Sequence, residues 1–325
     1  TPTATPVPPP TPAPHQAALD LILRQPETDS ATTLTALLAL ERKFPDKPDI
    51  HQEIVKWISG LSDRTRTMNP GGLASLRTPL ETAASSGFPD AAILLGEMTR
   101  KTDPSGALKW FLKAADVGNT DAMVKAGEMI AKGAGDAAPD LAAGAKLFQR
   151  AADLQDPVAM YDLGECFLHG KGVAKDASRA VQLLSGAAAK HNARAMNLLG
   201  DLYKNGLPGT ITPNPAEAFR LFSSAKDLGD LDAQGNLGVL YINGLGVNED
   251  DKKAVELFKD GSDKGNALCM FFYAMALESG VGGTPVNIEK AKELYLSAAQ
   301  GGNPPALDWC KKNNVPVRAP AGASR

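Results

Sequence analysis

The residues of this chain that are most able to do chemistry gather around position 166. Cys166 and His169 stand three positions apart beside Glu165, and residues at this spacing share one face of a helix, where they could hold a metal ion. No second pair of ligands follows at metal-binding spacing. The Gly-Lys-Gly segment at 170–172 resembles part of a phosphate loop, but it lacks the leading glycine spacing and a Ser or Thr after the lysine. We therefore expect no metal, no cofactor and a simple turn at 170–172.

The cysteines predict no disulfide framework. The chain has three, Cys166, Cys269 and Cys310, so one would stay unpaired in any scheme, and they lie in different segments without metal-ligand spacing. We expect them to be small buried apolar residues. Because the sequence shows no nucleophile, metal or phosphate-binding pattern, we expect no catalytic residues.

The clearest signal in the sequence is an internal repeat. A small residue returns at intervals of 31 to 38 positions, within the range of solenoids built from helix pairs, and it stands at Ala91, Ala122, Ala159, Ala195, Ala233 and Cys269. Apolar residues within each unit follow helical spacing, as at Leu199, Leu202 and Tyr203. Each unit therefore predicts a pair of helices.

The second helix of each pair has a predicted start. An Asp or Asn stands four residues before a small residue in each unit. Its side chain can accept a hydrogen bond from the unpaired amides of the first turn. These residues are Asp103, Asp140, Asp176, Asn214, Asp250 and Asn287. Pro104 and Pro215 follow two of these residues at the first helical position, where proline is favoured.

Small residues predict where the paired helices touch. Five glycines stand in the middle of first helices, where each costs about 1 kcal/mol relative to alanine, at Gly96, Gly127, Gly164, Gly200 and Gly238. A close approach of the second helix would compensate for this cost. That helix carries small residues two turns apart, such as Ala180 and Ala187, and we expect these to face the glycine.

These residues resemble a known family. The pattern A-x-x-x-L-G-x-x-Y-x-x-G, followed by Gly-Val, Asp, Lys-Ala and Ala-Ala, is similar to the Sel-one-like repeat, a relative of the tetratricopeptide repeat, and is fullest at 159–188 and 233–261. The second copy departs from the pattern with Ala126 in place of Leu, and the fourth carries an insertion at 207–212. The resemblance implies an all-α fold, a right-handed α-solenoid of stacked antiparallel helix pairs. It also implies an adaptor in protein complexes without catalytic residues.

The ends of the chain differ from the repeats. We expect a Pro/Thr-rich linker at 1–14, where seven prolines favour an extended spacer, and a helical N-terminal cap at 15–70 with helices at 16–23, 31–44 after a Ser30 cap, and 50–58. The repeat array is expected at 71–303, opening with a degenerate half-repeat helix at 73–86. A closing helix at 305–312 within 304–315 and a loose tail at 316–325 complete the predicted organisation.

Composition excludes several classes of partner. The net charge is −3 and aromatic residues make up 6%, without a basic cluster interleaved with aromatics, which argues against nucleic acid. No stretch approaches the ~20 apolar residues of a membrane helix. The Pro/Thr segment favours a bacterial cell envelope or periplasm, with a cytoplasmic location as the alternative.

By analogy with tetratricopeptide-like stacks, the first helices line the concave face, and the residue after each mid-helix glycine points into it. That position reads Glu97, Glu128, Glu165, Asp201, Val239 and Met275, so an acidic row turns apolar toward Phe271. The predicted partner-binding residues are Glu97, Lys101, Glu128, Lys132, Tyr161, Glu165, His169, Asn197, Asp201, Lys204, Val239, Asn243, Phe271 and Met275.

Two interpretations of the row stay open. Glu97 with Lys101 and Glu128 with Lys132 have the spacing of ordinary helix-stabilising pairs, so the row could be a solvated helix face. Alternatively the row, with its apolar end, is a binding face for a protein or peptide. The first functional hypothesis is a non-catalytic interaction scaffold, and the alternative is a regulatory or targeting module of a larger enzyme whose catalytic domain lies upstream.

Overall fold

The fold is entirely helical in the part of the chain that the structure describes. This computed structural model describes residues 13–24, 29–65, 68 and 70–317, where an isolated bridge between Leu207 and Ile211 is the one β-type pairing. The predicted linker at 1–14 and tail at 316–325 lie mostly outside these residues. The chain divides into two compact units, residues 1–154 and 155–325, which we describe separately.

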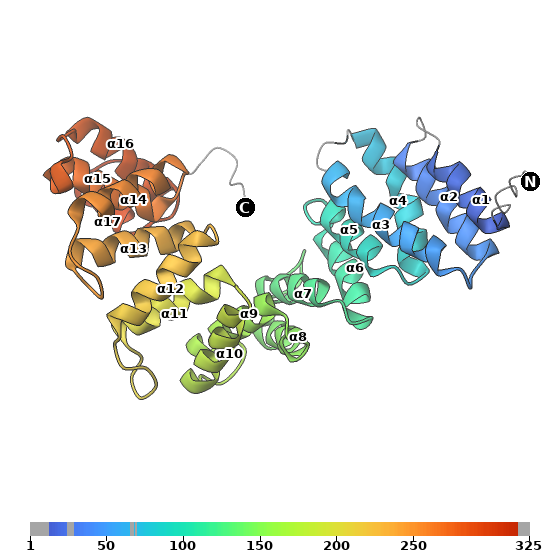
Figure 1. Cartoon of the computed structure of the whole chain (residues 1–325), viewed down its shortest axis with the longest axis horizontal. Coiled ribbons are helices and arrows are strands. Elements are labelled where there is room, and N and C mark those ends of the chain that lie inside the picture. The colour runs from blue at the N-terminus through green and yellow to red at the C-terminus, as the bar shows by residue number, and fades with distance from the viewer. Residues whose placement is uncertain (1–12, 25–28, 66–67, 69, 318–325) are drawn as a thin grey trace, which may run out of the picture. The chain divides into compact units, whose positions relative to one another are not determined.

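The first unit carries eight helices among its described residues, and most consecutive helices pack against one another (Figure 1). They are α1 (Pro14–Leu23), α2 (Ser30–Lys43), α3 (Pro48–Thr65), α4 (Pro70–Ser85), α5 (Pro89–Thr99), α6 (Pro104–Asp116), α7 (Thr120–Lys132) and α8 (Leu141–Asp153). The helices expected at the N-terminal end are present, with two corrections. Asp29 rather than Ser30 caps α2, because its carboxylate accepts from the Thr32 amide at 2.7 Å. The third helix extends to Thr65, because Leu61 continues its fully buried apolar face.

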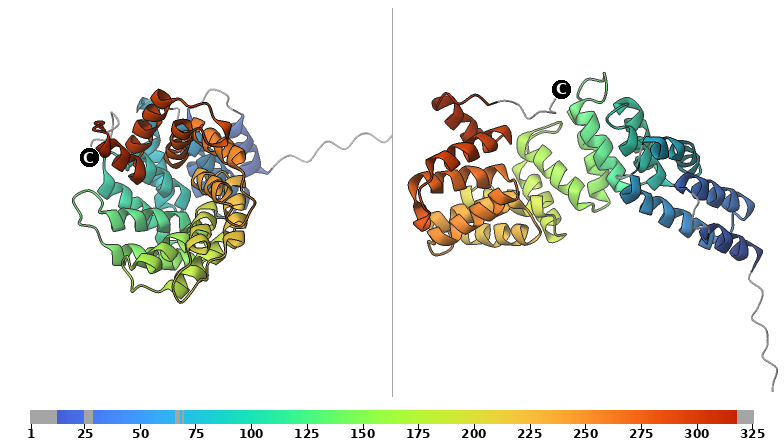
Figure 2. Two further views of the ribbon diagram at one scale, coloured as in Figure 1. Left: turned by 90° about the vertical axis from the view of Figure 1, so that its left-hand side faces the viewer. Right: turned by 90° about the horizontal axis from the view of Figure 1, so that it is seen from above.

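The second unit stacks its helices side by side in the same way (Figure 2). They are α9 (Pro157–His169), α10 (Ala177–Ala189), α11 (Ala193–Asn205), α12 (Pro215–Asp227), α13 (Leu231–Asn243), α14 (Asp251–Asp263), α15 (Ala267–Ser279), the short 3-10 helix η1 (Val281–Gly283), α16 (Ile288–Gln300) and α17 (Pro304–Lys312). The last of these is the expected closing helix. The predicted all-α solenoid of paired helices is confirmed.

All six predicted caps begin the second helix of a repeat. Each side chain accepts a hydrogen bond, 2.8–3.1 Å long, from the amide three residues later. Pro104 and Pro215 occupy the first helical position, as expected. These bonds fix where α6, α8, α10, α12, α14 and α16 start.

Five of the six first helices and α17 have side-chain caps that the sequence analysis did not identify, whereas α5 follows Phe88, which forms no such cap. The caps are Asn119, Asp156, Asn192, Asp230, Asn266 and Asn303. Each cap side chain accepts a hydrogen bond from the backbone amide three residues later, which belongs to the small residue that marks the repeat or, in α17, to Ala306. The marker residues Ala91 to Cys269 are all 0% exposed. The repeated small residue therefore lies in a first turn that is fully buried, and in five of the six repeats a side chain also caps that turn.

The mid-helix glycines do mark close approaches, but the group that approaches differs from the prediction. A Cβ built at Gly200 would lie 2.6 Å from the ring of Phe222, and one at Gly164 would lie 2.9 Å from Cγ of Leu184. The residue facing the glycine is thus the large apolar side chain of the second helix, one turn after its first small residue. The small residues of the second helix also lie close to the first helix, because a Cβ built at Gly127 would lie 3.2 Å from the carbonyl oxygen of Gly144.

Candidate partner-binding surfaces

The position after the mid-helix glycine lines an open groove in each unit. In the first unit a groove of about 640 Å³ lies between α3, α4, α5 and α7, with Ile58, Leu73 and Ile93 among its apolar residues and Glu97 and Lys125 among its charged ones. In the second unit Val239 and Met275 line a second groove, of about 510 Å³. The structure therefore places three members of the predicted row at grooves, within the unit to which each belongs.

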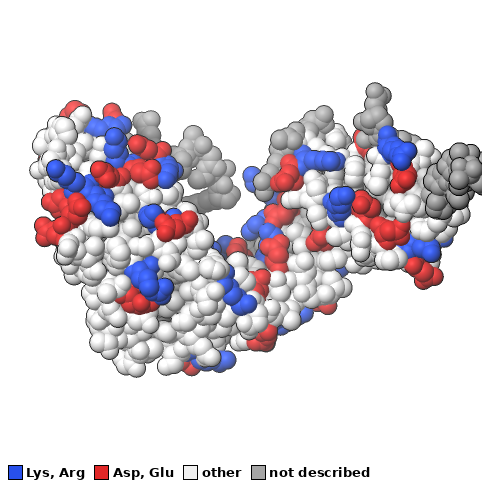
Figure 3. Space-filling model, viewed as in Figure 1, with Lys and Arg blue, Asp and Glu red and all other residues white. Residues whose placement is uncertain are grey.

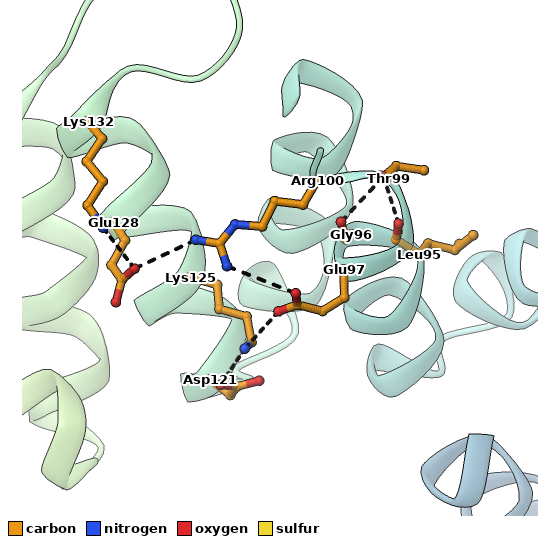
Figure 4. Close-up of polar contacts among 9 residues, drawn as sticks. All are labelled: Leu95, Gly96, Glu97, Thr99, Arg100, Asp121, Lys125, Glu128 and Lys132. Carbon is orange, nitrogen blue, oxygen red and sulfur yellow. Dashed lines mark hydrogen bonds and ion pairs between the residues drawn. The ribbon is translucent and has the colours of Figure 1, made fainter. Parts of the chain in front are cut away.

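Charged side chains in the first unit form a network that crosses from one repeat to the next (Figure 4). The ammonium of Lys125 on α7 lies 2.9 Å from the carboxylate of Glu97 on α5 and 3.5 Å from that of Asp121. The guanidinium of Arg100 lies 4.0 Å from Glu97 and 3.8 Å from Glu128. Neighbouring first helices are thus tied together by ion pairs on the face that carries the predicted row.

Burial and pairing act in opposite directions on Lys125. Its side chain is 27% exposed, and burial alone would lower the pKa of its ammonium. The hydrogen bond to Glu97 and the charge of Asp121 outweigh this effect and raise the pKa above its usual range. Lys125 therefore stays charged and holds Glu97 toward the groove.

The expected pairs within single helices are only half correct. Lys132 lies 3.3 Å from Glu128, as predicted. In the described part of the chain Glu97 pairs with Lys125 and Arg100 instead of Lys101, so that prediction is wrong. Helical spacing reveals neighbours within a helix, whereas Lys125 lies in the next repeat, 28 positions after Glu97.

Three predicted residues of α9 lie in different environments. Tyr161 is buried, and this burial, together with the charge of Glu165, raises the pKa of its hydroxyl to about 12. The guanidinium of Arg194 from α11 lies 4.6 Å from the Tyr161 ring centroid, a cation–π contact between repeats. His169, in the last turn, is exposed.

The predicted residues of α11 pair with their surroundings. The amide of Asn236 on α13 donates to the Asn197 side-chain oxygen at 3.0 Å, which joins two neighbouring first helices. Lys204 lies 2.7 Å from Asp201. Asn197 therefore has a structural partner already, whereas Asp201 keeps a side chain that is 37% exposed.

The groove of the second unit lies where the row turns apolar. Val239, Ile242 and Asn243 of α13 line it together with Phe272 and Met275 of α15. Three of these five, Val239, Asn243 and Met275, belong to the predicted set. The Asn243 amide donates to the Val239 carbonyl at 2.7 Å, which holds that side chain against its own helix.

Phe271 lies elsewhere, although it was predicted beside Met275. Its ring lies 5.7 Å from that of Tyr295 and packs against a buried cluster that includes Ala298 and Ala306 of the last two helices. Neighbouring positions on a helix point about 100° apart, and it is Phe272 that lines the groove. A role for Phe271 in partner binding stays a prediction.

The side chains of the described residues that could bind a metal or act as nucleophiles lie apart from one another. No group of three or more His, Cys, Asp or Glu side chains among them could hold a metal ion. The three cysteines are free and buried, and burial raises the pKa of the Cys269 thiol to about 12, so they lack thiolate character. In the described ranges no helix has both the length and the apolarity to span a bilayer.

Surface charge has no single sign on the face shown in Figure 3. Acidic and basic side chains stand close together there, and uncharged surface separates the groups. This matches the small net charge of −3. The surface on this face therefore presents local groups of charge rather than one uniform field.

The repeats match a known family model. Six consecutive Sel1 repeats are found at residues 89–119, 120–156, 157–192, 193–230, 231–266 and 267–303. Each matched segment contains one helix pair of the structure, from α5–α6 to α15–α16. The chain belongs to the Sel1 repeat family, which confirms the resemblance seen in its sequence.

Two solved structures of repeat proteins have a fold similar to that of this chain. A protective antigen of uropathogenic Escherichia coli that displays an SLR fold superposes with a TM-score of 0.63 at 25% identity, covering 90% of this chain and 58% of the antigen. A Sel1 repeat protein from Oxalobacter formigenes gives a TM-score of 0.61 at 28% identity, covering 72% of this chain and 94% of that protein.

Two curated proteins also resemble part of the chain. Chitin synthase regulatory factor 1 of Schizosaccharomyces pombe is 38% identical over 90 residues, and DAP3-binding cell death enhancer 1 of Rattus norvegicus is 32% identical over 141 residues. These matches cover 28% and 43% of this chain, but only 20% and 27% of the two relatives.

Proposed function

We propose that this chain is a non-catalytic scaffold or adaptor that holds a protein or peptide partner on the faces formed by its first helices. The observation that carries the proposal is the repeated use of one position. The residue after the mid-helix glycine, or the equivalent position in α15, lines a groove in both units, at Glu97, Val239 and Met275. Met275 is 45% exposed at its groove, so its apolar side chain is accessible to a partner.

Partner capture by variants tests this proposal. The full chain and two variants, Glu97→Lys in the first groove and Met275→Glu in the second, serve as baits in extracts of the native source. We expect a protein that the wild type retains and at least one variant releases. Lys109→Glu on the second helix α6 is the matched control, because Lys109 is exposed, lines neither groove and is not among the predicted partner-binding residues. Equal retention by all four baits would contradict the proposal.

The absence of catalysis has its own test. We expect the purified chain to show no hydrolytic or transfer activity, since the described residues hold no metal-binding group and the sequence no phosphate loop. Reproducible turnover that one point substitution abolishes would contradict the non-catalytic part of the proposal.

The alternative role is regulation or targeting of a larger enzyme. One relative is by name a regulatory factor of chitin synthase, and the matched region covers a fifth of it, 20% of its length. The same capture experiment separates the two roles. An enzyme that is retained, and whose rate changes when the chain binds, favours the regulatory role.

A further inference from the structure

The groove between α13 and α15 combines an apolar floor with an acidic edge. Val239, Ile242, Phe272 and Met275 supply apolar side chains, and Glu249 and Asp251 supply two carboxylates. None of the residues that line it is Lys or Arg. Its volume of about 510 Å³ falls in the range of pockets that enclose whole small ligands, so it has room for more than one side chain.

The backbone adds to the negative character of this groove. Helices α13 and α15 end beside it, at the C-caps Gly244 and Gly280, and the carbonyl end of a helix carries a partial negative charge. The two lysines that follow Asp251 do not line the groove, and the ammonium of Lys253 instead lies 4.6 Å from the Tyr241 ring centroid. A cation that enters the groove therefore meets two carboxylates and the negative ends of two helix dipoles.

The floor and edge are held in place by packing. The rings of Phe258 and Phe272 stack with centroids 5.0 Å apart. Gly282 has φ of 62° and approaches the start of α14 so closely that a Cβ there would lie 2.8 Å from the Asp251 carbonyl oxygen. The loop that carries Val281 is thus set against the acidic edge, while Met275 keeps a flexible, polarizable side chain at the opening.

We propose that this groove binds a segment of a partner protein in which a bulky apolar side chain stands next to Lys or Arg. This rests on the proposed scaffold function and names the chemistry of the partner. The apolar side chain would displace water from the floor between Phe272 and Met275. The neighbouring cation would face Glu249 and Asp251, which supply complementary charge and so favour basic segments over acidic ones.

Selection from a random peptide library tests the proposal without knowledge of the natural partner. Displayed dodecapeptides are selected on the full chain, and the dissociation constants of enriched peptides are measured for wild type and Met275→Glu. Met275 is 45% exposed, so the variant should keep its fold, which circular dichroism verifies. We expect enriched peptides with an apolar residue beside Lys or Arg, and affinity more than about tenfold weaker for Met275→Glu, as for an interface anchor.

The acidic edge is tested with the double variant Glu249→Gln/Asp251→Asn, which removes two charges and keeps the shape. Affinity should fall and lose much of its salt dependence. Glu289→Gln/Glu293→Gln on α16 is the matched control, because it removes two charges outside the groove, and its affinity should equal that of wild type.

Two outcomes of the selection would overturn the proposal: no peptide is enriched, or the enriched peptides lack an apolar residue beside Lys or Arg. Two outcomes of the binding measurements would also overturn it: the enriched peptides bind Met275→Glu as tightly as wild type, or they bind the chain only after residues 318–325 are removed. The last result would assign the groove to residues 318–325 of the chain itself. If the natural partner is captured equally by Met275→Glu but lost by Glu97→Lys, this proposal fails while the scaffold function stands.

Discussion

Single residues in the first unit show how the repeats are held in register. Lys125 lies between Glu97 and Asp121, and it belongs to a different repeat from Glu97. An exposed ion pair contributes about 0.2–1 kcal/mol, and the network and partial burial of Lys125 place this pair toward the upper part of that range. Its contribution is to the contact between first helices, not to either helix alone.

A double-mutant cycle measures this contribution. We expect Glu97→Gln and Lys125→Met to show a coupling free energy of about 0.5–1 kcal/mol in denaturant melts at low salt. The coupling should shrink at high salt, where the charges are screened over a few ångströms. The same cycle with Lys101→Met in place of Lys125→Met should give a coupling near zero. A larger coupling for Lys101 would mean that Glu97 pairs within its own helix after all.

Tyr161 predicts a pH dependence of stability. Its pKa is raised from 10.0 to about 12 by burial and then by Glu165. The folded chain therefore holds this proton more tightly than the unfolded chain, so the stabilising contribution is complete below pH 10.0 and is lost as the pH rises toward about 12. In urea melts across this range, wild type should lose more stability than Tyr161→Phe. A constant difference from pH 8 to 12 would contradict the assignment.

At the scale of the helix, replacing glycine by alanine should have opposite effects on stability at Gly60 and at Gly200. Gly200 faces the buried ring of Phe222, whereas a methyl group added at Gly60 in α3 would meet no atom within 4 Å. Alanine gains helix propensity at both positions, roughly 0.5–1 kcal/mol. At Gly200 this gain is outweighed by overpacking, which costs about 1–3 kcal/mol.

The two alanine substitutions therefore make a matched pair. We expect Gly60→Ala to raise the free energy of unfolding slightly and Gly200→Ala to lower it by about 1–2 kcal/mol. Gly164→Leu, a larger intrusion against Leu184, should cost several kcal/mol. Equal gains from Gly60→Ala and Gly200→Ala would show that the paired helices do not approach closely at the mid-helix glycine.

The helices were largely predictable from the sequence, and the site only in part. Caps such as Asp103 act over three residues, so their effect is visible in a short stretch. Lys125, the partner of Glu97, lies in the next repeat, so this pairing depends on how one repeat is rotated against the next, which no local pattern encodes. The place of Phe271 has another cause, because neighbouring positions on one helix point about 100° apart and Phe272 lines the groove. Val239 and Met275, which follow the mid-helix small residue of their helices, do line a groove, and their role in partner binding stays a prediction.

At the scale of the whole chain, each repeat contacts chiefly its neighbours, so stability should behave as a sum of repeats and interfaces. Consecutive helices pack together from α4 to α8 in the first unit and throughout the second, and the chain divides after residue 154 into these two compact units. A defect in one unit should then loosen that unit first. This expectation concerns the free energy of unfolding of each unit, so it holds for any arrangement of the two units.

Hydrogen exchange measured by mass spectrometry tests this expectation with two equivalent defects. Gly96→Leu would press on Phe111 in the first unit, and Gly238→Leu would press on Phe258 in the second. We expect Gly96→Leu to speed exchange in α5–α8 and leave α13–α16 near wild-type rates, and Gly238→Leu to do the reverse. Each variant serves as the control for the other, because the substitution and the packing environment are the same. If either defect accelerates exchange equally in both units, the chain unfolds as one cooperative body, and the nearest-neighbour description of this repeat array is wrong.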